Sequence, residues 1–396
     1  MNKPDYLKNP DFSIVLGGPL FQLLHRAHLT GDALELLRRR VFVISMLAWL
    51  PLLVLSALEG TALGGGAAIP FLLDVEVHVK YLGIIPLLIV AELVVHKRMR
   101  FVVKQFVERN LIAENDLPKF DAAIASAFRL RDSVLAEALL IAFVYVVGVL
   151  IVWRHYTTLT TTTWYAAVSG GSSKLSLSGV WYGYVSVPLF QFLIMRWYFR
   201  LFIWTRFLAQ VSRLGLSLVP THPDHVGGLG FLSDTVYAFT PLAVAHGGLL
   251  AGFIANRILY VGASLPQFKV EIAVLVVFLL CLVLGPLLLF TPQLAEAKRT
   301  GNREYGTLAE RYVREFDSKW LRGGAPPGEP LVGSGDIQSL ADLNNSFEVV
   351  RTMGIAPITK DAVIRLAAAA LIPIVPLALT MMPLEELLKK LIGIVF

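Results

Sequence analysis

The chain has 396 residues, of which 56% are hydrophobic and only 16% are charged, and its mean hydropathy is +0.65. An average soluble domain carries about 25% charged residues. A chain this apolar is neither disordered nor fibrous, and its single cysteine, Cys281, excludes an internal disulfide framework. The composition predicts an all-α, polytopic membrane protein.

A helix needs roughly 20 apolar residues to cross the hydrocarbon core of a bilayer. Six segments meet this requirement, and a seventh contains Pro373 and Pro376 and is expected either to cross as a broken helix or to re-enter. The sequence therefore predicts about 6–7 transmembrane helices with cytoplasmic helical extensions. In chain order the expected spans are Val41–Leu58, Tyr81–His96, Ala136–Trp153, Trp181–Trp204, Thr235–Ala255, Val270–Thr291 and Ala362–Met382.

Lysine and arginine are distributed unevenly between the two sides of these spans. With a cytoplasmic N-terminus, 27 of the 35 basic residues fall on the inner side and 7 on the outer side. Basic residues concentrate on the cytoplasmic side of membrane proteins. The start of the chain carries charges and prolines and does not resemble a signal peptide. We therefore expect an inner (plasma) membrane location and contact with anionic inner-leaflet lipid, and not with nucleic acid.

Four regions follow from this pattern. Residues 1–40 are expected to form a cytoplasmic N-terminal segment with an amphipathic stretch, Leu20–Arg40, whose last three arginines mark the membrane boundary. Residues 41–291 are expected to form a six-helix transmembrane domain with a cytoplasmic helical hairpin at 97–134, in which the helical pattern of the second span continues through Arg109. Residues 292–361 are expected to be a cytoplasmic helical segment with a charged helix at Gln293–Leu321 and a second helix at Asp336–Met353. Residues 362–396 are expected to be the seventh or re-entrant membrane helix and an amphipathic tail. The outer loop 154–180 alternates β-branched residues around Gly170-Gly171, which is typical of a small β-hairpin.

Ionisable residues inside the expected spans are candidates for function, because their burial in lipid is costly. His246 lies near the middle of its span, and Glu92 lies about one turn from the basic end of the second span. Glu137 and Glu271 lie within one or two turns of a span end. Glu92 can pair with Lys97, Arg98 or Arg196, and His246 is followed by two glycines that permit close helix packing. The candidate pore or intramembrane polar residues are Glu92, Glu137, His246, Glu271 and Arg365.

Four arginines at the inner end of the fourth span, Arg196, Arg200, Arg206 and Arg213, are candidates for lipid or anion contact. Arg196 and Arg200 are four residues apart and share a helix face. A voltage sensor would need arginines at every third position through the membrane centre, and this spacing excludes one.

The segment His222-Pro-Asp-His225 precedes the glycine-rich run Gly227-Gly-Leu-Gly230. His222, Asp224 and His225 are a weak candidate for a divalent metal site, because zinc needs three or four protein ligands. Alternatively, Asp224 caps the following turn, or the glycines form a re-entrant turn or an anion-binding loop.

No nucleotide-binding, protease or hydrolase motif is present, so an enzyme is the less favoured interpretation. The leading hypothesis is a transport protein, an oligomeric ion or small-solute channel with a pore between identical subunits. One alternative is a membrane scaffold or sensor that docks a partner through residues 292–361. Another is a metal-dependent lipid enzyme that uses His222, Asp224 and His225.

Overall fold

The computed structural model describes residues 12–19, 22, 37–153, 163–169 and 172–381. The described chain is almost entirely helical, as the composition predicts. The α-helices are α3 (Leu37–Leu58), α4 (Val75–His78), α5 (Ile85–Glu108), α6 (Leu117–Arg131), α7 (Val134–Phe143), α9 (Leu177–Trp181), α10 (Val187–Val211), α11 (Thr235–Val261), α12 (Lys269–Leu284), α13 (Thr291–Phe316), α14 (Gly335–Thr352) and α15 (Lys360–Leu371).

Several of these helices continue into tighter or wider turns. The π-helical segments are η3 (Val79–Ile84), η5 (Val144–Trp153), η6 (Tyr182–Ser186) and η10 (Asp317–Leu321). The 3₁₀ segments are Phe71–Leu73, Glu114–Asp116, Gly230–Asp234, Leu265–Phe268, Gly285–Phe290 and Val375–Met381. Through them, residues 75–108 and 177–211 each form one long helical run.

Five helical runs are long and apolar enough to cross a membrane: Leu37–Leu58, Val75–Glu108, Leu177–Val211, Gly230–Val261 and Leu265–Leu321. A sixth is obtained if α15 and Val375–Met381, which meet at a bend of 54°, count as one span. The bend agrees with the broken helix expected at Pro373. The third expected span is the apolar helix Val134–Gly148, which is shorter than the others. The expectation of 6–7 spans is therefore supported for five or six helices.

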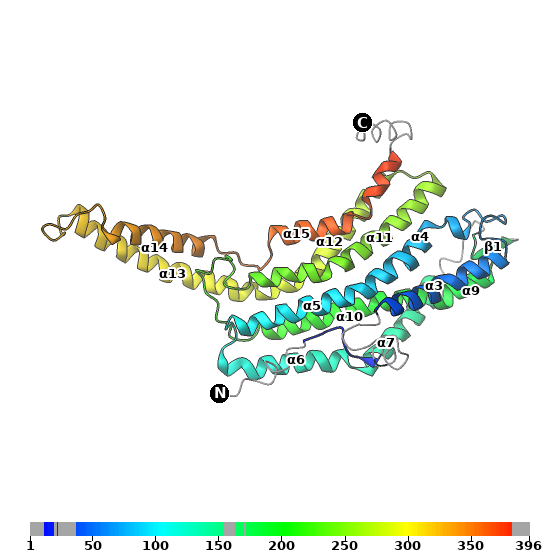
Figure 1. The fold of residues 1–396 in the computed structure, drawn as a ribbon, viewed down its shortest axis with the longest axis horizontal. Coiled ribbons are helices and arrows are strands. Elements are labelled where there is room, and N and C mark those ends of the chain that lie inside the picture. The colour runs from blue at the N-terminus through cyan, green and yellow to red at the C-terminus, as the bar shows by residue number, and fades with distance from the viewer. Residues whose placement is uncertain (1–11, 20–21, 23–36, 154–162, 170–171, 382–396) are drawn as a thin grey trace.

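The long helices lie roughly side by side, and the two ends of the molecule differ (Figure 1). Helices α5 and α10 run through the middle, with α3 beside α5, α6 along α10, and α11 between α5 and α15. At one end the antiparallel strands β1 (Ala166–Ser169) and β2 (Ser172–Leu175) form the small hairpin that the sequence predicts. At the other end, α13 and α14 form a helical hairpin that extends beyond the remaining helices.

Close helix contacts depend on small residues at defined places. A Cβ atom on Gly247 in α11 would lie 2.0 Å from the carbonyl oxygen of Ala370 in α15. Only glycine fits there, which bears out the expectation that this pair of glycines permits close packing. Near the β-hairpin, the carboxylate of Asp74 accepts hydrogen bonds from the indole of Trp164 (2.9 Å) and the amide of Asn256 (2.8 Å). These bonds join three distant segments at that end.

Candidate functional site: a buried cluster of arginine and glutamate side chains

Glu92 of α5 lies at the centre of a buried group of charged side chains. Its Oε1 atom accepts a hydrogen bond from Nη2 of Arg200 at 2.6 Å and lies 3.8 Å from Nη1 of Arg196. Its other oxygen pairs with the guanidinium of Arg40. Only 6% of Glu92 is exposed. Three arginines from two other helices therefore converge on one buried carboxylate.

A second carboxylate extends the group. Nε of Arg196 lies 3.5 Å from Oε1 of Glu137. Glu137 is held in the first turn of α7, where the hydroxyl of Ser133 caps the helix by accepting from the N–H of Ala136. We call Arg40, Glu92, Glu137, Arg196 and Arg200 the charge cluster. It connects helices α3, α5, α7 and α10.

Among the residues that the structure describes, the charge cluster contains three cations and two anions, which gives one formal positive charge in excess. All five side chains belong to residues that are at most 8% exposed. Buried charges are tolerated when they are paired, and an ionisable group among membrane-length helices is a functional-site hypothesis by default. An excess cation in such a place favours the approach of an anion.

Two residues of the charge cluster lie near the start of a helix, whereas Glu92, Arg196 and Arg200 lie within long helical runs. Arg40 is the fourth residue of α3, and Glu137 is the fourth residue of α7. For a helix of membrane length such as α3, this places Arg40 near one edge of the apolar layer. Glu92 is the eighth residue of α5, and this helix continues past the span end at His96 to Glu108, as the sequence pattern through Arg109 predicts.

The N-terminal segment 12–19 covers one side of the charge cluster. Arg131 of α6 donates to the carbonyl oxygen of Ser13 at 2.7 Å. Ile14 lines a small, partly open cavity together with Arg131, Glu137, Arg196 and Arg200. Gly18 has φ +89°, and a Cβ atom there would lie 3.5 Å from the Glu137 carboxylate. This turn lets the chain pass close over the charges.

The structure divides the residues singled out from sequence. Glu92 and Glu137, expected as pore residues, lie together with Arg196 and Arg200, expected to contact lipid or anions. The remaining candidates do not join them. Arg206, Arg213, Glu271 and Arg365 are exposed, and the guanidinium of Arg365 lies 4.3 Å from the ring of Tyr237.

His246 is buried in α11 apart from the charge cluster. Its Nδ1 atom lies 2.7 Å from the carbonyl oxygen of Leu242, and its Nε2 atom lies 2.7 Å from the hydroxyl of Tyr198. A neutral imidazole that donates through Nδ1 and accepts at Nε2 satisfies both contacts. Both ring nitrogens of His246 therefore have hydrogen-bond partners within the packed helices, which explains how this polar side chain is buried.

The segment His222–Gly230 forms a loop organised by Asp224. The Asp224 carboxylate accepts the backbone N–H groups of Val226, Gly228 and Gly230 at 2.8–3.1 Å. Partial burial raises the pKa of Asp224, but these bonds and nearby His222 outweigh burial and lower it. The cap interpretation of Asp224 is confirmed, and two of the glycine N–H groups expected to face an anion are occupied by this carboxylate.

The two histidines of this segment have different partners. His222 Nδ1 lies 2.9 Å from Asp224, whereas His225 Nδ1 lies 3.1 Å from the hydroxyl of Thr352 in α14. Among the residues that the structure describes, no group of three or more His, Cys, Asp or Glu side chains is arranged to hold a metal ion. The proposed metal site at His222, Asp224 and His225 therefore gains no support from the geometry.

Arg40 was missed as a site residue because it follows Arg38 and Arg39, and the three together were expected to mark a membrane boundary. Arg38 and Arg39 are exposed, whereas Arg40 is 3% exposed. Arg40 shares the buried face of α3 with residues 48, 52 and 56, at multiples of four. This helical periodicity is the signal that could have separated Arg40 from its neighbours.

Comparison with protein-family models, with curated proteins and with solved structures gave no match.

Proposed function

We propose that this protein is an integral membrane transport protein, an oligomeric channel that passes small anions and is controlled at the charge cluster. The observation that carries the proposal is the convergence of Arg40, Arg196 and Arg200 on two buried carboxylates, with one positive charge in excess. Rings or clusters of arginine are how anion pathways attract their ions.

The membrane placement is supported by two independent features. Five or six helices have the length and apolarity of membrane spans. The basic residues gather on one side of those spans, which favours a cytoplasmic N-terminus. In this placement α6 and the α13–α14 hairpin extend into the cytoplasm, and the β1–β2 hairpin faces the opposite side. An inner membrane location follows from the same charge distribution.

The arrangement described here is a closed one under this proposal. The small cavity at Arg196, Arg200 and Glu137 has a volume of about 10 Å³, which holds about one water molecule. Segment 12–19 forms part of its wall through Ile14. Displacement of this segment would expose the arginines, so we assign segment 12–19 the role of gate.

The test is anion flux into phosphatidylcholine vesicles that contain the purified full chain. We expect chloride flux in the wild type. In Arg196→Gln we expect chloride flux to fall by about tenfold or more, since losing one charged contact to the passing anion costs about 1.4 kcal/mol or more. Arg206→Gln is the matched control, because Arg206 is exposed on the same helix. The absence of chloride flux in vesicles that contain folded protein, or an equal loss of flux in the two variants, would overturn the proposal.

The oligomeric state is tested separately. The pore is proposed to lie between identical subunits, so the purified protein must have a mass that is a multiple of 43.6 kDa once bound detergent is subtracted. Light scattering in detergent measures this mass. A strictly monomeric protein that still conducts would place the pathway within one chain.

The α13–α14 hairpin favours a second candidate function, a scaffold or sensor that docks a cytoplasmic partner. This hairpin extends away from the other helices (Figure 1), and its exposed apolar side chains include Val313, Val332 and Ile337. The scaffold proposal predicts that Val313→Asp with Ile337→Asp removes a partner from crosslinked complexes and leaves chloride flux unchanged. The channel proposal makes no demand on these two residues.

A further inference from the structure

An open groove of about 360 Å³ runs between α3 and the helical run that contains α5. Its apolar walls are formed by the side chains of Val41, Phe42, Met46, Leu82, Pro86 and Val90. Of the residues that line it, Arg38 is the one that carries a charge and Ser45 the one that carries a hydroxyl. Sites of about 300–1,000 Å³ with mostly apolar walls and a few polar groups are typical of ligand binding. We call this space the α3–α5 groove.

Two contacts hold the walls of the α3–α5 groove in place. At one end, Arg40 of α3 pairs with Glu92 of α5. At the other end, the indole of Trp49 in α3 donates to Nδ1 of His78 in α4 at 2.9 Å. The apolar residues of both walls lie between these two contacts in the sequence. The groove is therefore formed by the packing of the helices themselves and needs no ligand to open it.

Arg38 marks the polar end of the groove. It is the second residue of α3, so in the membrane placement argued above it lies at the inner edge of the apolar layer. Within the described part of the chain its guanidinium has no carboxylate partner, whereas Arg40 two residues later pairs with Glu92. An unpaired arginine at this depth attracts the headgroup of an anionic lipid.

Ser45 supplies a second, independent observation. It is only 3% exposed, yet its hydroxyl has no hydrogen-bond partner among the residues that the structure describes. Buried hydroxyls normally have a partner, because an unpaired one costs free energy. Ser45 lies seven residues after Arg38, which is about 10 Å along α3 toward the centre of the apolar layer. An occupant with an acceptor oxygen at this level would satisfy the hydroxyl.

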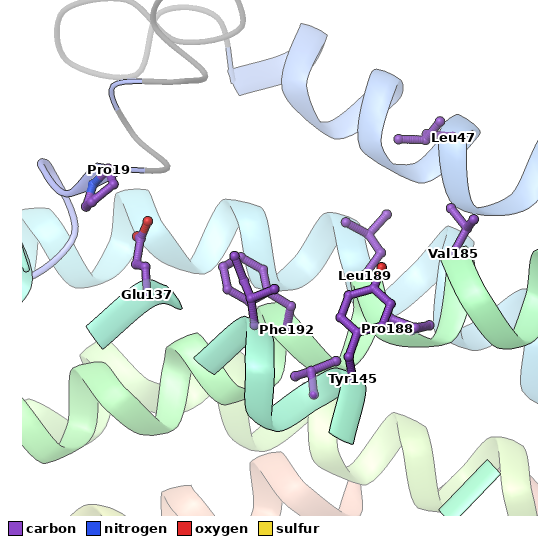
Figure 2. Close-up of a pocket in the computed structure, with 10 residues that line it drawn as sticks. Pro19, Leu47, Glu137, Tyr145, Val185, Pro188, Leu189 and Phe192 are labelled. Atoms are coloured by element: carbon purple, nitrogen blue, oxygen red, sulfur yellow. The ribbon is translucent and has the colours of Figure 1, made fainter. Parts of the chain in front are cut away.

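Another apolar cavity, of about 440 Å³ between α3, α7 and α10, provides a contrast (Figure 2). Its ionisable residue is Glu137, which lies at one end and whose carboxylate is 3.5 Å from Nε of Arg196. An acyl chain of any lipid fits such a cavity. Of the two spaces, the α3–α5 groove is the one that offers a cation without a carboxylate partner, so it can select its occupant by charge.

We propose that the α3–α5 groove binds an anionic glycerophospholipid of the inner leaflet. The phosphate lies at Arg38, an ester carbonyl accepts the hydroxyl of Ser45, and the acyl chain continues past Leu82 toward the centre of the membrane. A glycerophospholipid carries its charge, its esters and its hydrocarbon in this order, whereas the acceptor oxygens of a free fatty acid all belong to its charged group. The proposal uses the membrane placement argued above and does not depend on anion transport.

Photocrosslinking of the full chain in phosphatidylcholine vesicles tests the proposal. Three probes carry the same diazirine-labelled acyl chain: phosphatidylglycerol, zwitterionic phosphatidylcholine and a free fatty acid. The measured quantity is labelling of peptides 37–46 and 82–90 relative to peptide 134–148 of the contrasting cavity. We expect this ratio to be about fivefold higher for phosphatidylglycerol than for phosphatidylcholine, equivalent to about 1 kcal/mol for one arginine at an anionic headgroup. Equal ratios for these two probes, or the highest ratio for the fatty acid, would overturn the proposal.

A matched pair of variants tests the charge. Arg38→Gln should abolish the preference for phosphatidylglycerol. Arg39→Gln should keep it, because Arg39 is exposed beside Arg38 but does not line the groove. An equal loss of preference in the two variants, or none in Arg38→Gln, contradicts the assignment of the headgroup to Arg38 whether or not the protein conducts.

The contact at Ser45 is tested with Ser45→Ala and an ether-linked phosphatidylglycerol probe, which lacks the ester carbonyl. In the wild type the ether probe should label the groove less than the ester probe, and in Ser45→Ala the two should label equally. The free energy of unfolding in lipid-free detergent should not fall in Ser45→Ala, because the hydroxyl has no partner within the described structure. Equal labelling by the ester and ether probes in the wild type would overturn this contact and with it the proposed position of the lipid.

Discussion

Two regions of this molecule are rich in arginine–glutamate pairs, yet they differ in what those pairs do. In the α13–α14 hairpin, pairs such as Arg311–Glu315 lie on one helix, four residues apart, and both side chains are more than 60% exposed. In the charge cluster the pairs join different helices, and the side chains of Arg40 and Glu92 are only 4% and 8% exposed. The same chemical groups thus occur in water and in a nearly dry interior.

The difference shows that environment, and not the count of ion pairs, sets their weight. Exposed pairs at i,i+4 contribute about 0.3–0.5 kcal/mol, because water and salt screen them. Breaking a buried pair costs about 3–5 kcal/mol, because the remaining charge has no solvent to replace its partner. The hairpin pairs therefore keep a projecting helix soluble, whereas the charge cluster fixes the relative positions of four helices.

The largest expected effect is that of Glu92→Gln. Three buried arginines lose their common carboxylate, so the free energy of unfolding should fall by about 3–5 kcal/mol. Denaturant unfolding of the detergent-solubilised protein measures this change. Glu271→Gln is the control, since Glu271 is exposed on α12. Similar destabilisation by both substitutions would show that burial does not distinguish the two carboxylates.

The next effect is that of Arg40→Met, compared with Arg38→Met. Glu92 keeps Arg200 when Arg40 is lost, so we expect a smaller cost than for Glu92→Gln, about 1–3 kcal/mol. Arg38 lies two residues before Arg40 on α3 and is exposed, so it should tolerate the same substitution. The comparison uses the same unfolding assay. If Arg38→Met is the more damaging variant, the assignment of Arg40 to the charge cluster is wrong.

A local effect is expected in the hairpin at Asp336, near the end distant from the helix bundle. Hydrogen bonds from Lys319 and from the indole of Trp320 hold the pKa of Asp336 below its ordinary value of 3.8. Their stabilising contribution is therefore complete above pH 3.8 and is lost as pH falls through the lower pKa of the folded state. The indole N–H resonance of Trp320 should shift on acidification and in Asp336→Asn at neutral pH. A resonance that is insensitive to both changes would contradict this.

The smallest effect is that of Glu315→Gln on α13. It removes an exposed pair with Arg311, whose Nε lies 3.0 Å from the carboxylate. We expect a change in unfolding free energy below about 0.5 kcal/mol, further reduced in 0.5 M salt. A loss close to that of Glu92→Gln would mean that the hairpin contributes to the folded core, against the contrast drawn above.

Much of the architecture could be predicted because it depends on local patterns. Long apolar runs predicted five or six helices of membrane length that the structure contains, and the β-branched residues around Gly170-Gly171 predicted the β-hairpin. The charged pattern predicted hairpin helices at residues 293–321 and 336–353. The observed helical segments, 291–321 and 335–352, differ from these bounds by at most two residues. The pattern through Arg109 also predicted the end of α5 at Glu108, because charged residues can extend a helix beyond the apolar layer.

The candidate site could be predicted only in part. The sequence predicted that Glu92 can pair with Arg196, and Nη1 of Arg196 lies 3.8 Å from Oε1 of Glu92. Arg40 pairs with Glu92, and Glu137 lies beside Arg196. Arg40 and Glu137 are 97 residues apart in the sequence, and no local pattern indicates either contact. The expected amphipathic segment Leu20–Arg40 and the tail 383–396 lie largely or wholly outside the described residues.

The amino-acid sequence by itself determined the helical class, the apolar layer and the asymmetry of basic charge, because hydrophobicity and charge act residue by residue along the chain. Only the tertiary structure decided which charges are buried together and that an apolar cavity with a polar end lies beside them. Both depend on how helices distant in the sequence pack against one another, and that packing determines the local dielectric and hence the weight of each charge.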